Sequence, residues 1–266
     1  MRKIISITDW NTDELTRERF RTVVEGYSAN RKHVNIQSLS CTSSSIHAGF
    51  LAYEMALTEA KNGDPTDTLI YIDIDTEQET YPPDVTVRSD GFAVIRLTNN
   101  LLVCGRLSGY SFAWVKQSAQ QLLEYTGLQN SGTATILDSH ARVVAHLADY
   151  MDDQLDLQSL HEADILSLPI DAYFVCHKYK NTLVTTLNHS NLESCSVGDQ
   201  IKIQIGSKTY SAHLVSNPKQ ESDSGLIMYV GHYGHPDLRC IELVAKSSSI
   251  QERFIDIVPG DQIALV

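Results

Sequence analysis

The chain has 266 residues, of which 42% are hydrophobic and 20% charged, enough for one large domain or two ordinary ones. Its formal net charge of −12 at pH 7 excludes the basic surface of a nucleic-acid scaffold, so we expect no nucleic-acid partner. No apolar run approaches the roughly 18 residues of a membrane span. Residues 1–4 lead directly into a strand pattern without a signal-peptide core. We therefore expect a cytoplasmic protein with no membrane partner.

The predicted elements of the first two-thirds alternate between strand and helix. Asn11 or Thr12 is the expected cap of the first helix, and the serines at 43–45 are the expected cap of the second. In chain order the pattern predicts a strand at 4–8, a helix at 12–27, a strand at 33–39, a helix from 43–45 to about 61, strands at 68–74 and 91–97, and helices at 114–125 and 139–151. Such alternation favours a mostly parallel sheet flanked by helices.

The pattern changes near residue 170, where short alternating runs separated by turn residues begin. We predict seven strands here, at 173–177, 182–187, 200–205, 208–215, 227–231, 240–245 and 262–266. Closely spaced short strands of this kind indicate a smaller, all-β, antiparallel, barrel-like domain. The sequence therefore predicts an α/β domain over residues 1–168 and a barrel-like domain over residues 172–266.

Two acidic residues, Asp9 and Asp73, each follow an apolar, β-branched run that is typical of a buried parallel strand. Ligands of open α/β sheets bind at the carboxyl ends of the strands, so this edge is the expected site. A pair of carboxylates there can accept hydrogen bonds from a sugar diol, hold a cation or take a proton. The alternative is that both residues only cap a helix or end a strand in a turn.

The sequence offers little support for a metal site. The five cysteines are odd in number and widely spaced, and none forms a Cys-x-x-Cys pair, which argues against structural zinc and a disulfide framework. His213, His232 and His235 lack the spacing of known metal motifs. We predict no metal and no separate cofactor.

The acidic run after the third predicted strand, Asp73, Asp75, Glu77 and Glu79, could suit a hard cation only if the segment were extended, with alternate side chains on one face. A solvated acidic loop is the preferred interpretation of this run.

Several short segments resemble the S-adenosylmethionine hydroxide adenosyltransferases and their relatives, the fluorinase and the chlorinase. The segments are the opening Thr8-Asp9 strand, Gly26 at the end of the first helix, the acidic end of the third strand, residues 181–187 (NTLVTTL), 231–234 (GHYG), 241–249 (IELVAKSSS) and 258–263 (VPGDQI). Each motif is weak alone, and their shared order along nearly the whole chain makes the resemblance moderately specific.

The resemblance implies a homotrimer that binds S-adenosylmethionine between the first domain of one subunit and the barrel of the next. Water, or another nucleophile, would displace methionine at the ribose C5′ and yield adenosine when water attacks. Asp9 would hold the ribose diol, and Asp73 would position or deprotonate water. The remaining residues implied to bind substrate are Trp10, Ser44, Thr76 and Asn99 from one subunit and Tyr179, Asn181, His232, Tyr233 and Ser248 from the next.

The sequence also departs from that family. The family's arginine is absent near Thr80, and its histidine motif corresponds to residues 133–138 (TATILD), which contain no histidine although His140 lies close by. Of the family's Asp-Arg-His set for activating water, Asp73 alone is retained at a matching position. The carboxylates of Asp73 and Asp75 would repel a halide, so halogenation is disfavoured.

Two classes of function follow from these observations. One is an enzyme that cleaves S-adenosylmethionine with altered machinery. The other is a catalytically inactive protein that binds S-adenosylmethionine or a nucleoside as a sensor or assembly subunit.

Overall fold

A computed structural model of the chain describes residues 1–10, 13–29, 34–76, 79, 81, 87–88, 91–127, 135–219 and 225–266. The chain divides into two compact units, Met1–Ser167 and Leu168–Val266, and the boundary predicted from the sequence was near residue 170. The first unit is α/β and the second is a closed β-barrel, as the coarse fold prediction stated. None of the helices in the described ranges is long and apolar enough to cross a bilayer.

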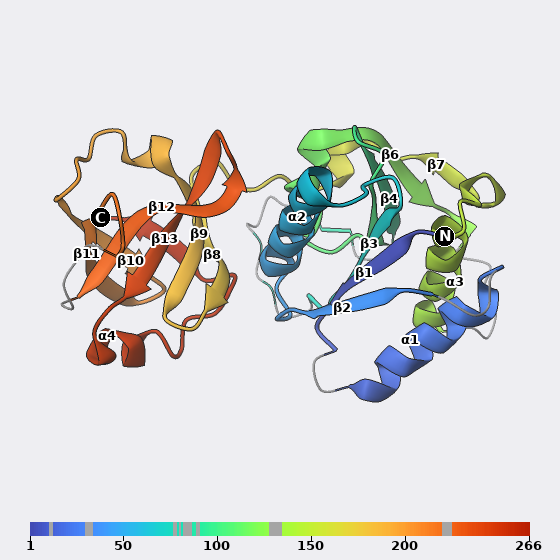
Figure 1. Ribbon diagram of the computed structural model, residues 1–266, viewed down its shortest axis with the longest axis horizontal. Helices are drawn as coiled ribbons and strands as arrows, with labels where there is room; N and C mark the ends of the chain where they lie inside the picture. The colour runs from blue at the N-terminus through green and yellow to red at the C-terminus, as the bar shows by residue number, and fades with distance from the viewer. Residues whose placement is uncertain are drawn as a thin grey trace. The chain divides into compact units, whose positions relative to one another are not determined.

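The sheet of the first unit has seven strands in the order β2-β1-β3-β5-β4-β6-β7 (Figure 1). The strands are β1 (Lys3–Thr8), β2 (Ile36–Ser40), β3 (Thr68–Asp73), β4 (Phe92–Leu97), β5 (Leu102–Arg106), β6 (Ala119–Tyr125) and β7 (Leu157–Ser159). The neighbours β2, β1, β3 and β5 run parallel, whereas β4, β6 and β7 pair in antiparallel fashion. The sheet is therefore mixed, with a parallel half that contains both predicted ligand-facing strands.

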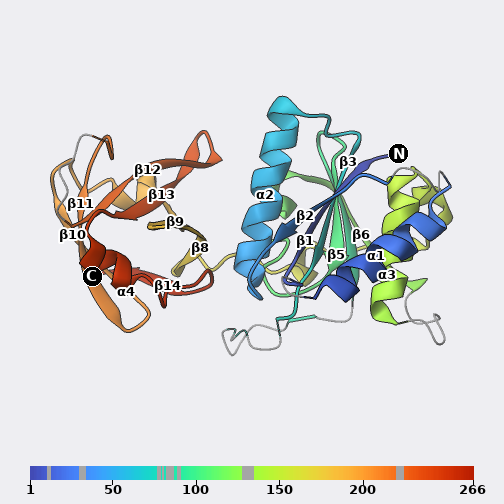
Figure 2. The same cartoon turned by 60° about the horizontal axis from the view of Figure 1, so that its bottom comes forward.

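Three helices cover the two faces of this sheet (Figure 2). They are α1 (Glu14–Tyr27), α2 (Ser45–Asn62) and α3 (Ile136–Ala148). The apolar face of α2 packs with Ile5, Ile7 and Ile70, and α1 and α3 pack together with Leu69 and Tyr71 on the other face. Since successive side chains of a strand point to opposite faces, each central strand contributes to both cores.

Local capping explains where the helices begin. Asp13 caps α1 by accepting a 2.9 Å hydrogen bond from the Thr16 amide, and the predicted cap residues Asn11 and Thr12 lie outside the described residues. Ser44 caps α2, within the predicted serine run. Gly26 lies inside the last turn of α1 and does not end it.

The helix predicted at 114–125 is wrong. A short 3₁₀ helix, η1 (Val115–Ser118), is followed by strand β6, which pairs with β4. The segment contains three Gln and two Leu, residue types that favour helix locally. Pairing along β4 gives the backbone its hydrogen bonds and places Leu122 and Leu123 against opposite cores, so tertiary context overrides local propensity. The strand β5, which sequence patterning missed, supplies the other neighbour of β4.

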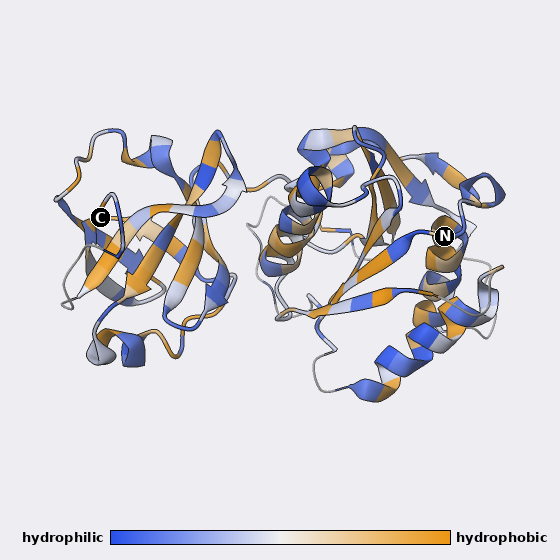
Figure 3. Ribbon diagram, in the orientation of Figure 1, coloured by the Kyte–Doolittle hydropathy of each residue, from blue (hydrophilic) through white to orange (hydrophobic). Residues whose placement is uncertain are grey.

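The second unit is a closed barrel in the order β10-β11-β12-β13-β9-β8-β14. Its strands are β8 (Tyr173–Tyr179), β9 (Thr182–Asn188), β10 (Gln200–Ile205), β11 (Lys208–Leu214), β12 (Leu226–His235), β13 (Leu238–Ala245) and β14 (Gln262–Leu265). The pairing of β11 with β12 is parallel, so the prediction of an antiparallel barrel is wrong at this one seam. Hydrophobic and hydrophilic residues alternate along its strands (Figure 3), as expected for one face turned to the core.

Shorter elements complete the chain. They are the 3₁₀ helices η3 (Asp152–Gln154), η4 (Glu162–Asp164) and η5 (His189–Leu192), and the six-residue helix α4 (Ser248–Arg253) before β14. Lys178 of β8 donates hydrogen bonds to the carbonyl oxygens of Phe254 and Ile257, which follow α4, at 2.7 and 2.9 Å. These bonds tie the end of that helix to the barrel wall.

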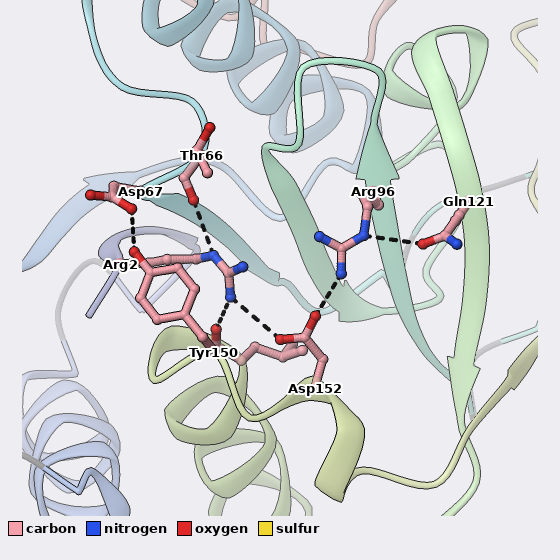
Figure 4. Close-up of polar contacts among 8 residues, drawn as sticks. Arg2, Thr66, Asp67, Arg96, Gln121, Tyr150 and Asp152 are labelled. Atoms are coloured by element: carbon pink, nitrogen blue, oxygen red, sulfur yellow. Dashed lines mark hydrogen bonds and ion pairs between the residues drawn. The ribbon is translucent and has the colours of Figure 1, made fainter.

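A charged network holds the amino-terminal edge of the sheet together (Figure 4). Arg2, only 5% exposed, donates from Nε to the Thr66 carbonyl at 3.2 Å, and its Nη1 lies 3.6 Å from Asp152 Oδ1. The guanidinium also lies 4.2 Å from the centre of the Tyr150 ring. Asp152 Oδ2 is 2.5 Å from Arg96 Nη2 on β4. One carboxylate therefore balances two guanidiniums that come from distant parts of the unit's sequence.

We predict that Asp152→Asn destabilises the first unit by roughly 1–3 kcal/mol, because two arginines, one of them buried, lose their anionic partner. Both tryptophans, Trp10 and Trp114, lie in this unit, so urea unfolding followed by tryptophan fluorescence measures its stability. The exposed neighbour provides the control, and Asp153→Asn should leave the midpoint unchanged. Equal midpoints for both variants would contradict a role for this network.

Candidate functional site at the carboxyl edge of the sheet

Asp9 and Asp73 lie at the same edge of the sheet, where β1 and β3 end side by side. The strand register pairs Thr8 with Asp73, and Asp9 follows directly. Asp9 Oδ2 accepts hydrogen bonds from the Ser43 hydroxyl at 2.7 Å and from the Asp75 amide at 3.0 Å. These bonds connect the ends of β1 and β3 with the loop that leads into α2. Among the described residues, Oδ1 of Asp9 has no hydrogen-bond partner.

Asp73 is buried, with 6% of its surface exposed, and three side chains surround its carboxylate. Tyr71 donates a 2.9 Å hydrogen bond to Oδ2, and His140 Nδ1 lies 3.8 Å from the same oxygen. Arg106 Nε lies 3.6 Å from Oδ1. A buried carboxylate is costly unless it is paired and hydrogen-bonded, and these groups supply both kinds of partner.

Strand geometry accounts for this convergence. Tyr71 and Asp73 are two residues apart on β3 and so point to the same face of the sheet. Arg106 ends β5, whose Gly105 pairs with Ile72 of β3. Gly105 has φ of +149°, and a β-carbon there would overlap the carbonyl oxygen of Ile72. Glycine is therefore required for the close approach of β5 that places Arg106 beside Asp73.

His140 approaches from α3 and is 1% exposed. Its ring centre lies 4.8 Å from that of Phe92, and its Nδ1 is 3.4 Å from the Tyr71 hydroxyl. Tyr71 has one hydroxyl proton and donates it to Asp73, so His140 must be the donor in its contact with Tyr71. This order gives a directional chain from His140 through Tyr71 to the carboxylate. Burial, and then the charge of Asp73, hold the pKa of Tyr71 well above that of an ordinary tyrosine.

The structure thus gives Asp73 an arginine and a histidine, although neither lies at the position expected from the resemblance. The sequence pattern does not single out Tyr71 or Arg106 as site residues, and it gives His140 no role. A usable signal for Tyr71 was its spacing of two residues from Asp73 on a predicted strand. The Gly105-Arg106 pair could have been found only with β5 correctly assigned, since glycine in a strand marks a close backbone approach.

Trp10 and Ser44 have structural partners in this region. The Trp10 ring centre lies 5.6 Å from that of Phe20 and 6.5 Å from that of Tyr71, within an aromatic cluster under α1. The Ser44 hydroxyl accepts a 3.4 Å hydrogen bond from the His47 amide and is 5% exposed, so it serves as the cap of α2.

Thr76 follows Asp75 in the loop after β3, and its carbonyl accepts a 3.0 Å hydrogen bond from the Glu79 amide. The Glu79 carboxylate in turn accepts from the backbone amide and the hydroxyl of Ser45, each at 2.5 Å, at the start of α2. In the acidic run, Glu79 is therefore bonded to the protein, and Glu77 lies outside the described residues. In the described part of the chain, no three His, Cys, Asp or Glu side chains are grouped as a metal site requires.

Asn99 does not join the other predicted site residues. It lies in the turn between β4 and β5 and accepts a 3.2 Å hydrogen bond from the Leu101 amide. Since β5 runs parallel to β3 and begins beside Leu69, this turn lies at the amino-terminal edge of the parallel strands. Asn99 therefore sits at the edge opposite Asp9 and Asp73.

The barrel residues form two separate groups. In the first group, Asn181 donates a 2.8 Å hydrogen bond to the carbonyl of Ala245. Tyr179, at the end of β8, lies two residues before Asn181, and Ser248 lies three residues after Ala245. These three residues surround one end of β13.

His232 and Tyr233 lie toward the other end of β13, because Gly234 pairs with Arg239. The two groups are about 20 Å apart along the strand. The His232 amide donates a 2.8 Å hydrogen bond to buried Glu242, and the Tyr233 ring centre is 6.1 Å from that of His177. Burial lowers the pKa of His177.

The solved structures that resemble this chain belong to proteins described as uncharacterized or hypothetical. No protein-family model and no curated protein matches the chain. An uncharacterized conserved protein from Thermotoga maritima is 15% identical, with a TM-score of 0.67, and the match covers 99% of this chain and 100% of that one. A conserved hypothetical protein from Thermus thermophilus is 13% identical, with a TM-score of 0.61, and the match covers 100% of both chains. At these identities the similarity shows a shared fold alone.

We predict that Tyr71→Phe reduces the loss of stability at high pH. The folded state raises the pKa of this phenol, so its stabilising contribution is complete below the unfolded value of about 10 and is lost as pH rises above it. Urea midpoints of the wild type and the variant, measured at about pH 8 and about pH 11, should differ less for the variant. An identical pH dependence for the two proteins would contradict the burial of a neutral Tyr71.

Proposed function

We propose that the protein binds S-adenosylmethionine at the carboxyl edge of its sheet and displaces methionine at the ribose C5′ with water. The observation that carries the proposal is the group formed by Asp73, Tyr71, Arg106 and His140, next to Asp9 at the same edge. Asp9 Oδ1 accepts hydrogen bonds from the hydroxyls of the ribose diol, and Asp73 accepts a proton from the attacking water.

Each member of this group has a stated role. Asp73 accepts a proton as the water oxygen bonds to C5′, and the C5′–sulfur bond breaks with its electron pair passing to sulfur. The products are adenosine and methionine with an uncharged sulfur, so atoms and charge balance. Arg106 lies against Oδ1, Tyr71 donates to Oδ2, and His140 donates to the Tyr71 hydroxyl, so the three side chains together fix the orientation of the base.

Other nucleophiles fit this site less well. A halide would face the carboxylate of Asp73 at close range, and like charges in a poorly hydrated site repel strongly. Attack by a thiol of the protein is also disfavoured near Asp9, because burial, together with the charge of Asp9, raises the pKa of Cys41 to about 12. Water is therefore the proposed nucleophile.

A second candidate function is binding without catalysis. The same polar group can serve as a satisfied buried network that stabilises the sheet edge, with Asp9 still available for a nucleoside. The burial of Asp73 favours this alternative, because a base that acts on water must be reached by it. Product formation separates the two candidates.

We predict that the purified protein converts S-adenosylmethionine to adenosine and methionine, and that Asp73→Asn lowers the rate by roughly 10²–10⁴-fold. Chromatography of the reaction mixture measures both products. Asp153→Asn, an exposed carboxylate remote from the group, is the matched control and should retain the wild-type rate. Binding of the ligand by calorimetry without product would support the sensor, and absence of both binding and product would refute the proposal.

We further propose a homotrimer, in which the barrel of a second copy completes each adenosyl site with residues such as Tyr179 and Asn181. The exposure of Tyr179, at 57% of its surface, is consistent with a residue that contacts another copy. Light scattering at micromolar concentration should give the mass of three chains of 29.6 kDa. A monomeric mass would contradict the shared site.

A further inference from the structure

A cavity of about 220 Å³ lies in the first unit between α1 and the strands β1 and β2. We call it the α1 cavity. Its volume equals that of about seven liquid waters and is smaller than the sites that hold drug-sized ligands, so it suits a compact molecule. None of the groups that handle water in the proposed reaction lines it, and Trp10 is its one residue in common with the predicted adenosyl site.

The floor of the α1 cavity carries two hydroxyls on an otherwise apolar surface. Ser6 of β1 and Ser38 of β2 are register partners, and Ile36 lies beside them. Ser6 is 3% exposed, and in the described part of the chain its hydroxyl makes no hydrogen bond. Among the described residues, the fully buried side-chain polar atoms without a partner are Ser139 Oγ and Arg142 Nε, so the Ser6 hydroxyl still reaches the cavity and is open to a ligand there.

One wall is aromatic. The rings of Trp10 and Phe20 meet edge to face, with centres 5.6 Å apart, and both line the cavity. Together with Ile36 they form an apolar surface that an aliphatic side chain can cover. The cavity therefore joins an apolar wall to a polar floor, as small-ligand sites do.

The rim consists of two acidic and two basic residues of α1. Glu14, Arg17, Glu18 and Arg21 follow a spacing of three and four residues, which puts them on one face of the helix. Arg21 Nη1 is 3.9 Å from Glu18 Oε1, a distance typical of a weak surface pair. The rim has no formal net charge, so a simple anion or cation would meet as much repulsion as attraction.

These features define the ligand by its chemistry. We propose that the α1 cavity binds a free α-amino acid with an aliphatic side chain. The arginines of the rim and the Ser6 hydroxyl bind the α-carboxylate, the glutamates bind the α-ammonium, and the wall formed by Trp10 and Phe20 covers the side chain. The site is separate from the proposed adenosyl reaction and does not depend on it.

The test is calorimetric titration of the full chain with L-leucine. We expect saturable binding in the millimolar range, because three of the four rim residues, Glu14, Glu18 and Arg21, are exposed to water. 3-Methylbutylamine and 4-methylpentanoate, which lack the carboxylate and the ammonium respectively, should bind at least about tenfold more weakly. No heat of binding from leucine, or equal binding of all three compounds, would overturn the proposal.

Variants assign the binding to this cavity. Arg17→Gln and Ser6→Ala should each weaken leucine binding, by about tenfold and a few-fold respectively. Glu25→Gln, on α1 but outside the cavity lining, is the matched control for a changed charge on the helix and should bind as the wild type does. Unchanged affinity in both cavity variants, with urea midpoints showing that they fold, would refute the assignment.

Two further measurements separate this site from the adenosyl site. Asp73→Asn should leave leucine affinity unchanged, whereas loss of leucine binding in that variant would place the amino acid at the sheet edge. Crystals of the unlabelled protein soaked with L-selenomethionine should show the selenium anomalous peak beside Trp10 and Ile36. A peak elsewhere would overturn the proposal, whatever the outcome for adenosine formation.

Discussion

The buried carboxylate of Asp73 is the constraint on which the arrangement of the first unit depends. A carboxylate with so little contact with water must be paired and hydrogen-bonded, and no single segment of the chain supplies its partners. Tyr71 comes from its own strand, Arg106 from the inserted strand β5, and His140 from the helix on the same face. The insertion of β5 between β3 and β4 is therefore as important to the site as β3 itself.

The two edges of the sheet carry different arrangements of charge. At the amino-terminal edge, Arg2 and Arg96 share Asp152, and this network joins the start of the chain to the segment after α3. At the carboxyl edge, Asp9 and Asp73 place two carboxylates at the ends of neighbouring strands. Charges at the first edge are paired with one another and stabilise the fold, whereas Asp9 keeps acceptor capacity that a ligand can use.

The barrel contains a comparable buried carboxylate. Glu242 is 4% exposed, and it accepts hydrogen bonds from the Tyr229 hydroxyl and the His232 amide. Burial, and then the contact with Glu242, raise the pKa of Tyr229, which therefore stays a donor. A side chain at Gly231 would collide with the Glu242 carboxylate, so burial of Glu242 requires glycine at this position. The segment that suggested a ligand-binding loop thus also has a structural reason for its glycine.

The sequence by itself determined the elements whose signals are local. The helices α1 and α2, the strands β1 and β3, the change to short strands near residue 170 and the position of Asp9 and Asp73 at strand ends all follow from periodicity, capping and turn residues. Only the tertiary structure decided the rest. Residues 119–125 form a strand because they pair with β4. Asn99 lies at the edge opposite Asp9 and Asp73 because β5, which follows it, runs parallel to β3. Arg106 and His140, which are distant from Asp73 in the sequence, lie beside its carboxylate. Such outcomes depend on which strands become neighbours, and that choice is made by burial and backbone pairing over the whole sheet.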